Sequence, residues 1–417
     1  MLMQFFKKFI ILIAISTLIS SCGSFNPFNS TIETTSDGSY VIETGMTDSE
    51  LLSYGQIVIY RYKSVPNMVA VKSTNIGKGN HKYIYDKNIY SIPENNKKVR
   101  EEIKINTLSK TQIFGCSQAY CEARFNEVYN DLKVKNISLN AVDIAIVDSG
   151  VVPVTSSIKN ALASSSNISG NTNIINWSSH ATYIASLLVG YKDSYDNNFY
   201  DIYAENARIH SVKISFASDN EDPDKRKYGS MQLSVALDEA VSLGSKIVNL
   251  SFAYSQKPDD NVVMAEKIVM AYAAKSGVIF VCAAGNDGNK LDSFPVYPAS
   301  YDINNIITVG SHNTDLNRAI SSNYGKSVDL TAQGALIDLN NKYGEVDTVG
   351  GTSFAAPLVV AALSIYYGIT PNSNVNTTLK QLFSSANMNY NFYESQTIAH
   401  YGRVDVKKLY DIALLNH

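Results

Sequence analysis

The residues best suited to nucleophilic chemistry lie in a glycine-led turn, Gly350-Gly351-Thr352-Ser353, which an apolar run from Leu358 to Ile365 follows. Glycine permits a tight backbone turn, and the apolar run predicts a buried helix that begins near the serine. The free N–H groups and the dipole at the start of a helix stabilise developing negative charge. A serine at this position is therefore suited to attack a carbonyl carbon, because the attack creates an oxyanion.

A nucleophilic serine needs a base, and the base needs a group that orients it. Among the six histidines, His180 stands in a helix-opening context of small residues, Ser178 to Ser186. The acid candidate is Asp148, which ends an apolar run and precedes Ser149-Gly150. The run predicts a buried parallel strand, and side chains at its C-terminal end face the crevice where open α/β sheets bind ligands.

Four segments resemble the sequence motifs of the subtilase family of serine proteases. The order Asp148, His180, Ser353 is that of the subtilisin triad. The resembling segments are Ile146-Val147-Asp148-Ser149-Gly150, His180-Ala181-Thr182-x-Ile184-Ala185, Ala283-Ala284-Gly285-Asn286-Asp287-Gly288 and Gly351-Thr352-Ser353-x-Ala355-x-Pro357. The histidine motif departs from the family at Ala181, where glycine is usual. The resemblance covers residues 136 to 415.

The resemblance implies a serine endopeptidase. Ser353 would attack the scissile carbonyl, His180 would take its proton, and Asp148 would hold the imidazole. The Asn286 side-chain amide and the Ser353 N–H would form the oxyanion hole. The substrate-binding residues would be Ser251, Phe252 and Ala253, which pair with an extended peptide, and Gly285 on the facing wall. Ala253 stands where the family usually has glycine, which favours a modest apolar pocket.

The same residues also bear on other functions. An α/β-hydrolase esterase would need the motif Gly-x-Ser-x-Gly and the chain order Ser, Asp, His. This chain has Ala355 at the last position of the motif, and its order is Asp, His, Ser. A catalytically impaired, subtilase-like binding or scaffold lipoprotein stays open as an alternative, as does a tethered adhesin or toxin component. Ala181 and Ala253 favour impairment, whereas all four chemical groups are present.

The catalytic region, residues 136–417, alternates strands and helices. This alternation predicts an α/β fold with a mainly parallel, doubly wound sheet, next to a smaller N-terminal α+β region. The expected strands are Val142–Val147, Ala207–Ile214, Lys246–Phe252, Val278–Ala283, Ile306–Val309 and Val328–Thr331. The expected helices are Ser179–Val189, Met231–Leu243, Val262–Ser276 and Thr352–Tyr367.

The N-terminus has the features of an export signal. Lys7 and Lys8 precede an apolar stretch too short for an ordinary transmembrane helix, and the predicted signal peptide, residues 1–21, ends directly before Cys22 in the box Ile19-Ser20-Ser21-Cys22. This box resembles that of bacterial lipoproteins, which predicts a palmitate-containing lipid on Cys22 and a place in the bacterial cell envelope. An ordinary signal peptide with a chance cysteine is the alternative. Residues 22–48 are polar and are interpreted as a tether.

Residues 49–135 carry no family motif. Short strands are expected at Gln56–Tyr60, Met68–Val71 and Tyr83–Tyr85, and a helix from Cys121 to Leu132. Because subtilases often carry a small pro-region before the catalytic domain, this segment is either a pro-region that blocks the cleft or an accessory domain. A pro-region would cover the strand Ser251–Ala253 and would be cut off in the polar stretch from Glu122 to Asn140.

Composition and cysteine content limit the partners. The chain has 417 residues, 45% hydrophobic and 18% charged, with a net charge of −3 and no basic tract, so no nucleic-acid partner is expected. We expect a monomer that acts on proteins or peptides and needs no cofactor or catalytic metal.

Structural calcium is frequent in the family, but Asp193, Asp196 and Asn198 form no recognisable loop pattern. Cys116 and Cys121 are spaced to close a small disulfide loop, whereas Cys282 lies in an apolar strand.

Overall fold

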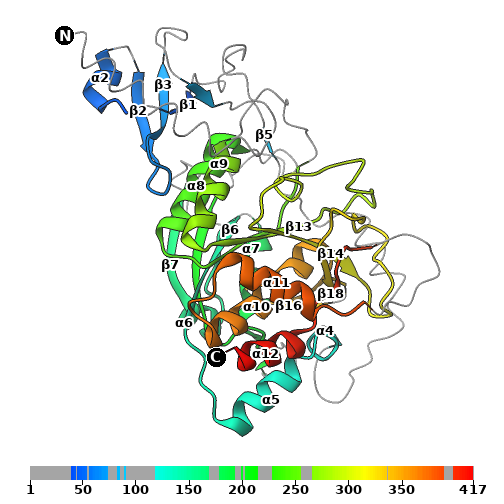
Figure 1. Cartoon of the computed structure of the whole chain (residues 1–417). Helices are drawn as coiled ribbons and strands as arrows, with labels where there is room; N and C mark the ends of the chain where they lie inside the picture. The colour runs from blue at the N-terminus through cyan, green and yellow to red at the C-terminus, as the bar shows by residue number, and fades with distance from the viewer. Residues whose placement is uncertain are drawn as a thin grey trace.

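The computed structural model describes most of the catalytic region and part of the N-terminal region. The described residues are 39–43, 45–53, 56–73, 82–84, 89–90, 118–168, 178–192, 199–200, 202–214, 228–254, 265–335, 337–388 and 398–416. The signal peptide, Cys22 and Cys116 therefore lie outside the described residues. A large body with a central sheet carries a small blue sheet at one end (Figure 1).

The central sheet has eight strands in the order β18-β15-β14-β13-β12-β6-β10-β7, and all neighbouring strands run parallel. The strands are β6 (Val142–Asp148), β7 (Leu162–Asn167), β10 (Ala207–Lys213), β12 (Ile247–Leu250), β13 (Ile279–Ala283), β14 (Ile306–His312), β15 (Leu330–Gln333) and β18 (Gly402–Arg403). The order reverses at β6, which lies between β10 and β12. Ligands bind at such a switch point, beyond the carboxyl ends of the strands.

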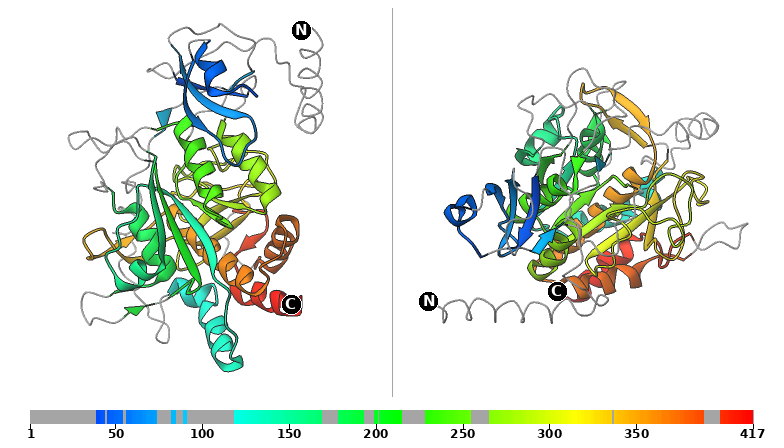
Figure 2. Two further views of the ribbon diagram at one scale, coloured as in Figure 1. Left: turned by 90° about the vertical axis from the view of Figure 1, so that its left-hand side faces the viewer. Right: turned by 90° about the horizontal axis from the view of Figure 1, so that it is seen from above.

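Helices cover both faces of the sheet, as the alternating pattern predicts (Figure 2). One face carries α4 (Gln118–Glu122), α5 (Phe125–Lys135), α6 (Ser156–Ala161), α7 (His180–Val189), α10 (Thr352–Ile369), α11 (Val375–Ser385) and α12 (Val406–Leu415). The other face carries α8 (Ser230–Ser242) and α9 (Ala265–Ala273). Along β6, Ile144 and Ile146 join the first core whereas Ala145 and Val147 join the second. A strand buried on both faces is therefore apolar throughout.

Helix α10 is the central helix of the first core. Among the described residues it is the helix long and apolar enough to cross a membrane, yet all of its residues are buried inside the protein. Its apolar sequence therefore reflects burial between the sheet and α7 and α12.

The N-terminal region forms a second, antiparallel sheet in the order β2-β3-β1-β4. Its elements are β1 (Ser39–Glu43), α2 (Asp48–Ser53), β2 (Gln56–Arg61), β3 (Met68–Ser73) and β4 (Lys82–Ile84). Strand β1 falls in the segment interpreted as a tether, so that interpretation is wrong for residues 39–43. The short aromatic and β-branched run Tyr40-Val41-Ile42 is the signal that the polar composition of the neighbouring residues masked.

The boundary expected at residue 135 is also corrected. Phe125, Val128 and Leu132 of α5 are buried in the same core as α10 and α12. The backbone N–H of Val406 donates to the carbonyl of Ala123. Residues 118–135 are therefore part of the catalytic body.

Several smaller elements are not predicted from the sequence. The edge strand β7 reads Leu-Ala-Ser-Ser-Ser-Asn, which has little β-branched or aromatic character. The helices α6, α11 and α12 and the hairpin β16 (Ile337–Asn340) and β17 (Val346–Val349) are also unpredicted. Two short pairs complete the described fold: β5 (Ile89–Tyr90) with β11 (Tyr228–Gly229), and β8 (Tyr191–Lys192) with β9 (Phe199–Tyr200). Two expected strands differ in their bounds: Val328–Thr331 lies two residues before β15, and Lys246–Phe252 is longer than β12, which it contains.

Candidate active site

Asp148 and His180 meet at the carboxyl end of β6. Asp148 is the last residue of β6 and is fully buried, and His180 opens α7 with 6% of its surface exposed. The distance from His180 Nδ1 to Asp148 Oδ2 is 2.8 Å. The Ser149 N–H donates to Asp148 Oδ1 over 2.6 Å, which fixes the other carboxylate oxygen. The pair is thus buried, hydrogen-bonded and oriented.

The start of α7 is held by short polar side chains. The N–H groups of His180 and Ala181 donate to the hydroxyls of Ser178 and Ser149, over 3.1 and 3.2 Å. These bonds satisfy donors that a helix N-terminus leaves without intrahelical partners. They also tie the histidine helix to the loop that follows Asp148.

The hairpin β16–β17 covers α7 from outside. The N–H groups of Lys342 and Asn340 donate to the hydroxyls of Ser179 and Ser186. Tyr183 of α7 donates its hydroxyl to Asp347 of β17. Ser179, directly before the helix, and Ser186, within it, therefore hold α7 and His180 against the hairpin. The sequence motifs do not predict this role.

Ser353 is the second residue of α10, and 5% of its surface is exposed. Its hydroxyl donates to the carbonyl of Ser251 over 2.9 Å, and the Ser251 hydroxyl donates to the carbonyl of Ser353 over 2.8 Å. The Asn249 amide donates to the Ser251 hydroxyl over 2.9 Å. The serine turn is therefore joined to the end of β12 by reciprocal hydrogen bonds.

Gly351 makes the serine turn sterically feasible. Its φ of 127° lies in the region that side chains rarely adopt. A Cβ at this position would stand 3.2 Å from Asn286 Nδ2. The glycine thus permits both the turn and the close approach of Asn286.

Asn286 lies beside the start of α10, in the turn that follows β13. Its Oδ1 accepts hydrogen bonds from the Thr352 N–H at 2.9 Å and the Thr352 hydroxyl at 3.1 Å. Both bonds use the Oδ1 end of the amide, and its other end, Nδ2, is a hydrogen-bond donor. The turn thus brings a side-chain donor to the helix N-terminus at which Ser353 stands.

The turn that carries Asn286 is supported by Asn323. Asn323 Nδ2 donates to the Ala284 carbonyl over 2.8 Å, and its Oδ1 accepts from the N–H groups of Asp287 and Asn289. A Cβ at Gly285, whose φ is 93°, would lie 2.6 Å from Asn323 Nδ2. The sequence assigns Asn323 no role, because its contacts join segments far apart along the chain.

The expected substrate-binding residues lie along one wall of the site. Ser251, Phe252 and Ala253 follow β12, and Tyr254 next to them pairs its backbone with Tyr297 over 2.9 and 2.8 Å. The Phe252 side chain is 1% exposed and packs in the core with α8 and α9. The Phe252 side chain is therefore part of the core and does not line the site. Gly285 faces Thr352, since its N–H donates to the Thr352 hydroxyl over 3.2 Å.

Two buried ionisable groups lie on strands of the sheet that carries the site. Lys213 stands opposite Asp148 in the register of β10 and β6, and burial lowers the pKa of its ammonium group. Burial raises the pKa of the Cys282 thiol, which suits a core residue and not a nucleophile. Cys121 is disulfide-bonded; its expected partner, Cys116, lies outside the described residues.

No metal centre is apparent in the part of the chain that the structure describes, where no three His, Cys, Asp or Glu side chains are placed to hold an ion. The oxygen-bearing residues considered for calcium, Asp193, Asp196 and Asn198, lie outside that part.

Comparison with known proteins identifies the family. The sequence profile of the subtilase family (Peptidase_S8) matches residues 140–401. Subtilisin DY of Bacillus licheniformis is 25% identical over 256 residues, which are 60% of this chain and 86% of that protein. The cell wall-associated protease of Bacillus subtilis is 29% identical over 238 residues, 56% of this chain and 24% of that protein.

Solved structures confirm the predicted fold. The epidermin leader peptide processing serine protease of Staphylococcus aureus superposes with a TM-score of 0.67 at 18% identity, covering 90% of this chain and 98% of that one. A cold-adapted subtilisin-like serine proteinase gives a TM-score of 0.50 at 22% identity, covering 63% and 89%. This chain belongs to the subtilase family and is a subtilisin-like serine peptidase.

Proposed function

We propose that the protein is a membrane-anchored serine endopeptidase that uses Asp148, His180 and Ser353 as its triad and Asn286 in its oxyanion hole. The observation that carries the proposal is the buried hydrogen bond between His180 Nδ1 and Asp148 Oδ2. This bond leaves Nε2 as the ring atom that serves as the base, and Ser353 stands at the helix N-terminus required for oxyanion binding.

The mechanism follows from these positions. The Ser353 hydroxyl turns from the Ser251 carbonyl toward His180 Nε2, which takes its proton as Oγ attacks the scissile carbonyl carbon. Asp148 stabilises the imidazolium that forms. The Asn286 amide and the Ser353 N–H bind the oxyanion, and His180 then protonates the leaving amine. A water molecule, deprotonated by His180 in the same way, then attacks the acyl group on Ser353 and releases it as the free acid.

An active-site fluorophosphonate probe tests the proposal. We expect labelling at Ser353 in the native protein, none after heat denaturation, and loss of casein hydrolysis in a folded Ser353→Ala variant. The alternative, a catalytically impaired scaffold lipoprotein, predicts no label at Ser353 and no casein hydrolysis by the wild type.

Substrates are proposed to bind as an extended strand along Ser251–Ala253, with a small apolar side chain in the primary pocket. Ala253 supports this choice, because its methyl group, at a position where the family usually has glycine, narrows the primary pocket. Cleavage of a peptide library by the wild type and by Ala253→Gly tests the idea: the glycine variant should accept larger side chains next to the cut. Identical preferences would contradict it.

The N-terminal sheet is proposed to be a pro-region. Figures 1 and 2 show it on α8 and α9, where its turn between β2 and β3 reaches the catalytic body. Tyr62 and Val65 of this turn are buried in one core with Ala236 of α8 and Val269 of α9. A template that covers these helices would assist the slow assembly of a parallel sheet.

The strand β5 supports the same proposal. Ile89–Tyr90 pairs antiparallel with Tyr228–Gly229, directly before α8. The sequence predicts a contact with Ser251–Ala253, whereas the described pairing uses Tyr228–Gly229. This pairing joins the region after the N-terminal sheet to the start of α8, which supports a template role, and the covering of Ser251–Ala253 stays a prediction.

The expected cut between Glu122 and Asn140 needs revision, because α5 is buried in the catalytic core. We place the cut N-terminal to Gln118. The wild type should then be purified as a shortened chain and Ser353→Ala as a full-length chain. If both stay full length while the wild type is active, the sheet is an accessory domain.

The cell envelope is the proposed location, through a lipid on Cys22. The support is the sequence Ile19-Ser20-Ser21-Cys22 after an apolar stretch. Mass spectrometry of the mature N-terminus tests it: a lipid-modified Cys22 in the membrane fraction is expected, and an unmodified N-terminus at another residue would exclude it.

A further inference from the structure

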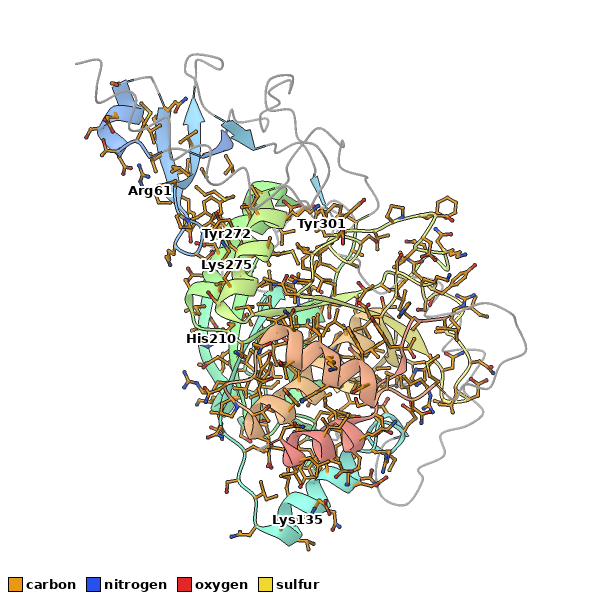
Figure 3. All side chains as sticks on the ribbon, viewed as in Figure 1. Arg61, Lys135, His210, Tyr272, Lys275 and Tyr301 are labelled. Carbon is orange, nitrogen blue, oxygen red and sulfur yellow. The ribbon has the colours of Figure 1, made fainter. Side chains whose placement is uncertain are left out.

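A second set of carboxylate, imidazole and hydroxyl groups lies in the central sheet, away from the triad. His210 of β10 contacts the strands on both sides: its Nε2 lies 2.8 Å from Asp143 Oδ1 of β6, and its Nδ1 lies 2.7 Å from Ser164 Oγ of β7. His210 is 5% exposed and Ser164 is half-buried. Figure 3 labels His210 at the left-hand side of the catalytic body.

For a neutral imidazole, the hydrogen-bond partners select one of its two tautomers. A carboxylate only accepts, so the neutral imidazole donates its Nε2–H to Asp143 and carries its lone pair on Nδ1. The Ser164 hydroxyl therefore donates to Nδ1. The arrangement matches that of an activated serine, with the two ring nitrogens exchanged. Arg208 Nε lies 3.1 Å from the same Asp143 oxygen and is a second, cationic partner of this carboxylate.

This cluster is independent of the triad. Asp143 stands near the start of β6 and Asp148 at its end, a separation of about 16 Å for five residues of strand. The two side chains also point to opposite faces of the sheet, because they are an odd number of residues apart. The strand that carries Ser164, β7, is the edge strand of the sheet among the described residues, and Ser164 is only partly buried.

We propose that Ser164 is a second reactive hydroxyl, one that accepts acyl groups from activated esters or thioesters. Its Oγ forms a bond to the acyl carbon while the bond from that carbon to the leaving oxygen or sulfur breaks. His210 Nδ1 takes the hydroxyl proton and passes it to the leaving group. The product is an O-acyl Ser164, and no oxidant or cofactor takes part.

The test uses the full-length Ser353→Ala protein, p-nitrophenyl acetate and mass spectrometry of the peptide that contains β7. The same strand supplies internal controls. Ser165 is exposed on the opposite face, and Ser166 donates to Glu239 over 3.1 Å. We expect acetylation of Ser164 on the order of 10²-fold faster than of either neighbour, the lower range of general-base catalysis.

Substitution of His210 or Asp143, the relay residues, distinguishes activation of the Ser164 hydroxyl from its solvent exposure. His210→Gln and Asp143→Asn, each in the Ser353→Ala background, should lower acetylation of Ser164 toward that of Ser165. The same two substitutions in the wild-type background should retain casein hydrolysis, which shows that the fold is intact; if one fails to fold, the other decides. Acetylation of Ser164 no faster than of Ser165, or unchanged in a folded relay variant, would overturn the proposal.

Discussion

The side-chain carbonyl of Asn286 accepts a hydrogen bond from the backbone N–H of Thr352, 2.9 Å away, at the residue directly before Ser353. This bond couples the proposed oxyanion donor to the turn that carries the proposed nucleophile. A substrate carbonyl attacked by Ser353 is then presented to a donor that is already oriented, so little reorganisation is needed as charge develops.

Asn286→Ala should therefore lower kcat about 10²–10³-fold with little change in KM, the range known for the corresponding donor in subtilisin. Steady-state kinetics on a peptide substrate measure the effect. Asn289→Ala is the matched control, because it lies in the same turn and uses only its backbone N–H to bond Asn323. Equal activities of the two variants would rule out the oxyanion role.

Asp148, His180 and Ser353 should behave as one unit. Ser353→Ala and His180→Ala should each lower kcat by at least about 10⁴-fold, and the double variant should be little worse than either. Asp148→Ala should retain more activity, because the serine and the base remain. Additive losses in the double variant would show that the residues act separately.

The parts of the site that the sequence predicts are those encoded by contiguous residues. The turn Gly351-Thr352-Ser353 and the strand end at Asp148 each combine a local backbone requirement with the functional side chain, so the residue pattern is specific. Asn323 and the contacts of Asp347 with Tyr183 join segments that are distant in the sequence, and no local pattern reports them. Strand β7 escapes prediction because pairing at the sheet edge, and not its serine-rich composition, makes it extended.

Asp329 gives the stability of the fold a specific pH dependence. Burial raises its pKa from 3.8 to about 6, although the Thr308 N–H donates to it over 2.8 Å. A folded-state pKa above the unfolded value contributes stability below about pH 4, and this contribution is lost as the pH rises through 6. Asp329→Asn should therefore raise the free energy of unfolding at pH 8 by up to about 3 kcal/mol and change it little at pH 4.

Asp292 is the control of opposite sign for the same denaturation experiment. Burial opposes its ionisation, but hydrogen bonds from Ser327 and Lys326 and the charge of Lys290 lower its pKa overall. Its contribution is present above the unfolded pKa and is lost as the pH falls, so Asp292→Asn should destabilise the protein at pH 8. Equal shifts for the two variants at pH 8 would contradict this account.

Asp238 of α8 is the residue on which docking of the N-terminal sheet should depend. It is fully buried, and four groups of the sheet donate to its carboxylate: the hydroxyls of Tyr60 and Ser64 and the N–H groups of Lys63 and Ser64. Burial, followed by the bond to Asp238, raises the pKa of Tyr60, so its hydroxyl stays a donor. Removing the carboxylate leaves these donors without their acceptor, at about 1–3 kcal/mol for each one that stays buried.

Asp238→Ala should therefore detach the sheet from α8. Its neighbour Glu239 pairs with the exposed Lys63, so Glu239→Ala should weaken docking of the sheet by less than about 1 kcal/mol. In a wild-type chain cut before Gln118, the two pieces should co-purify and stay at the membrane, which reconciles a lipid on Cys22 with a cut pro-region. Asp238→Ala should release the catalytic piece into the soluble fraction and Glu239→Ala should not. Equal release from both variants would show that the sheet is held by apolar packing alone.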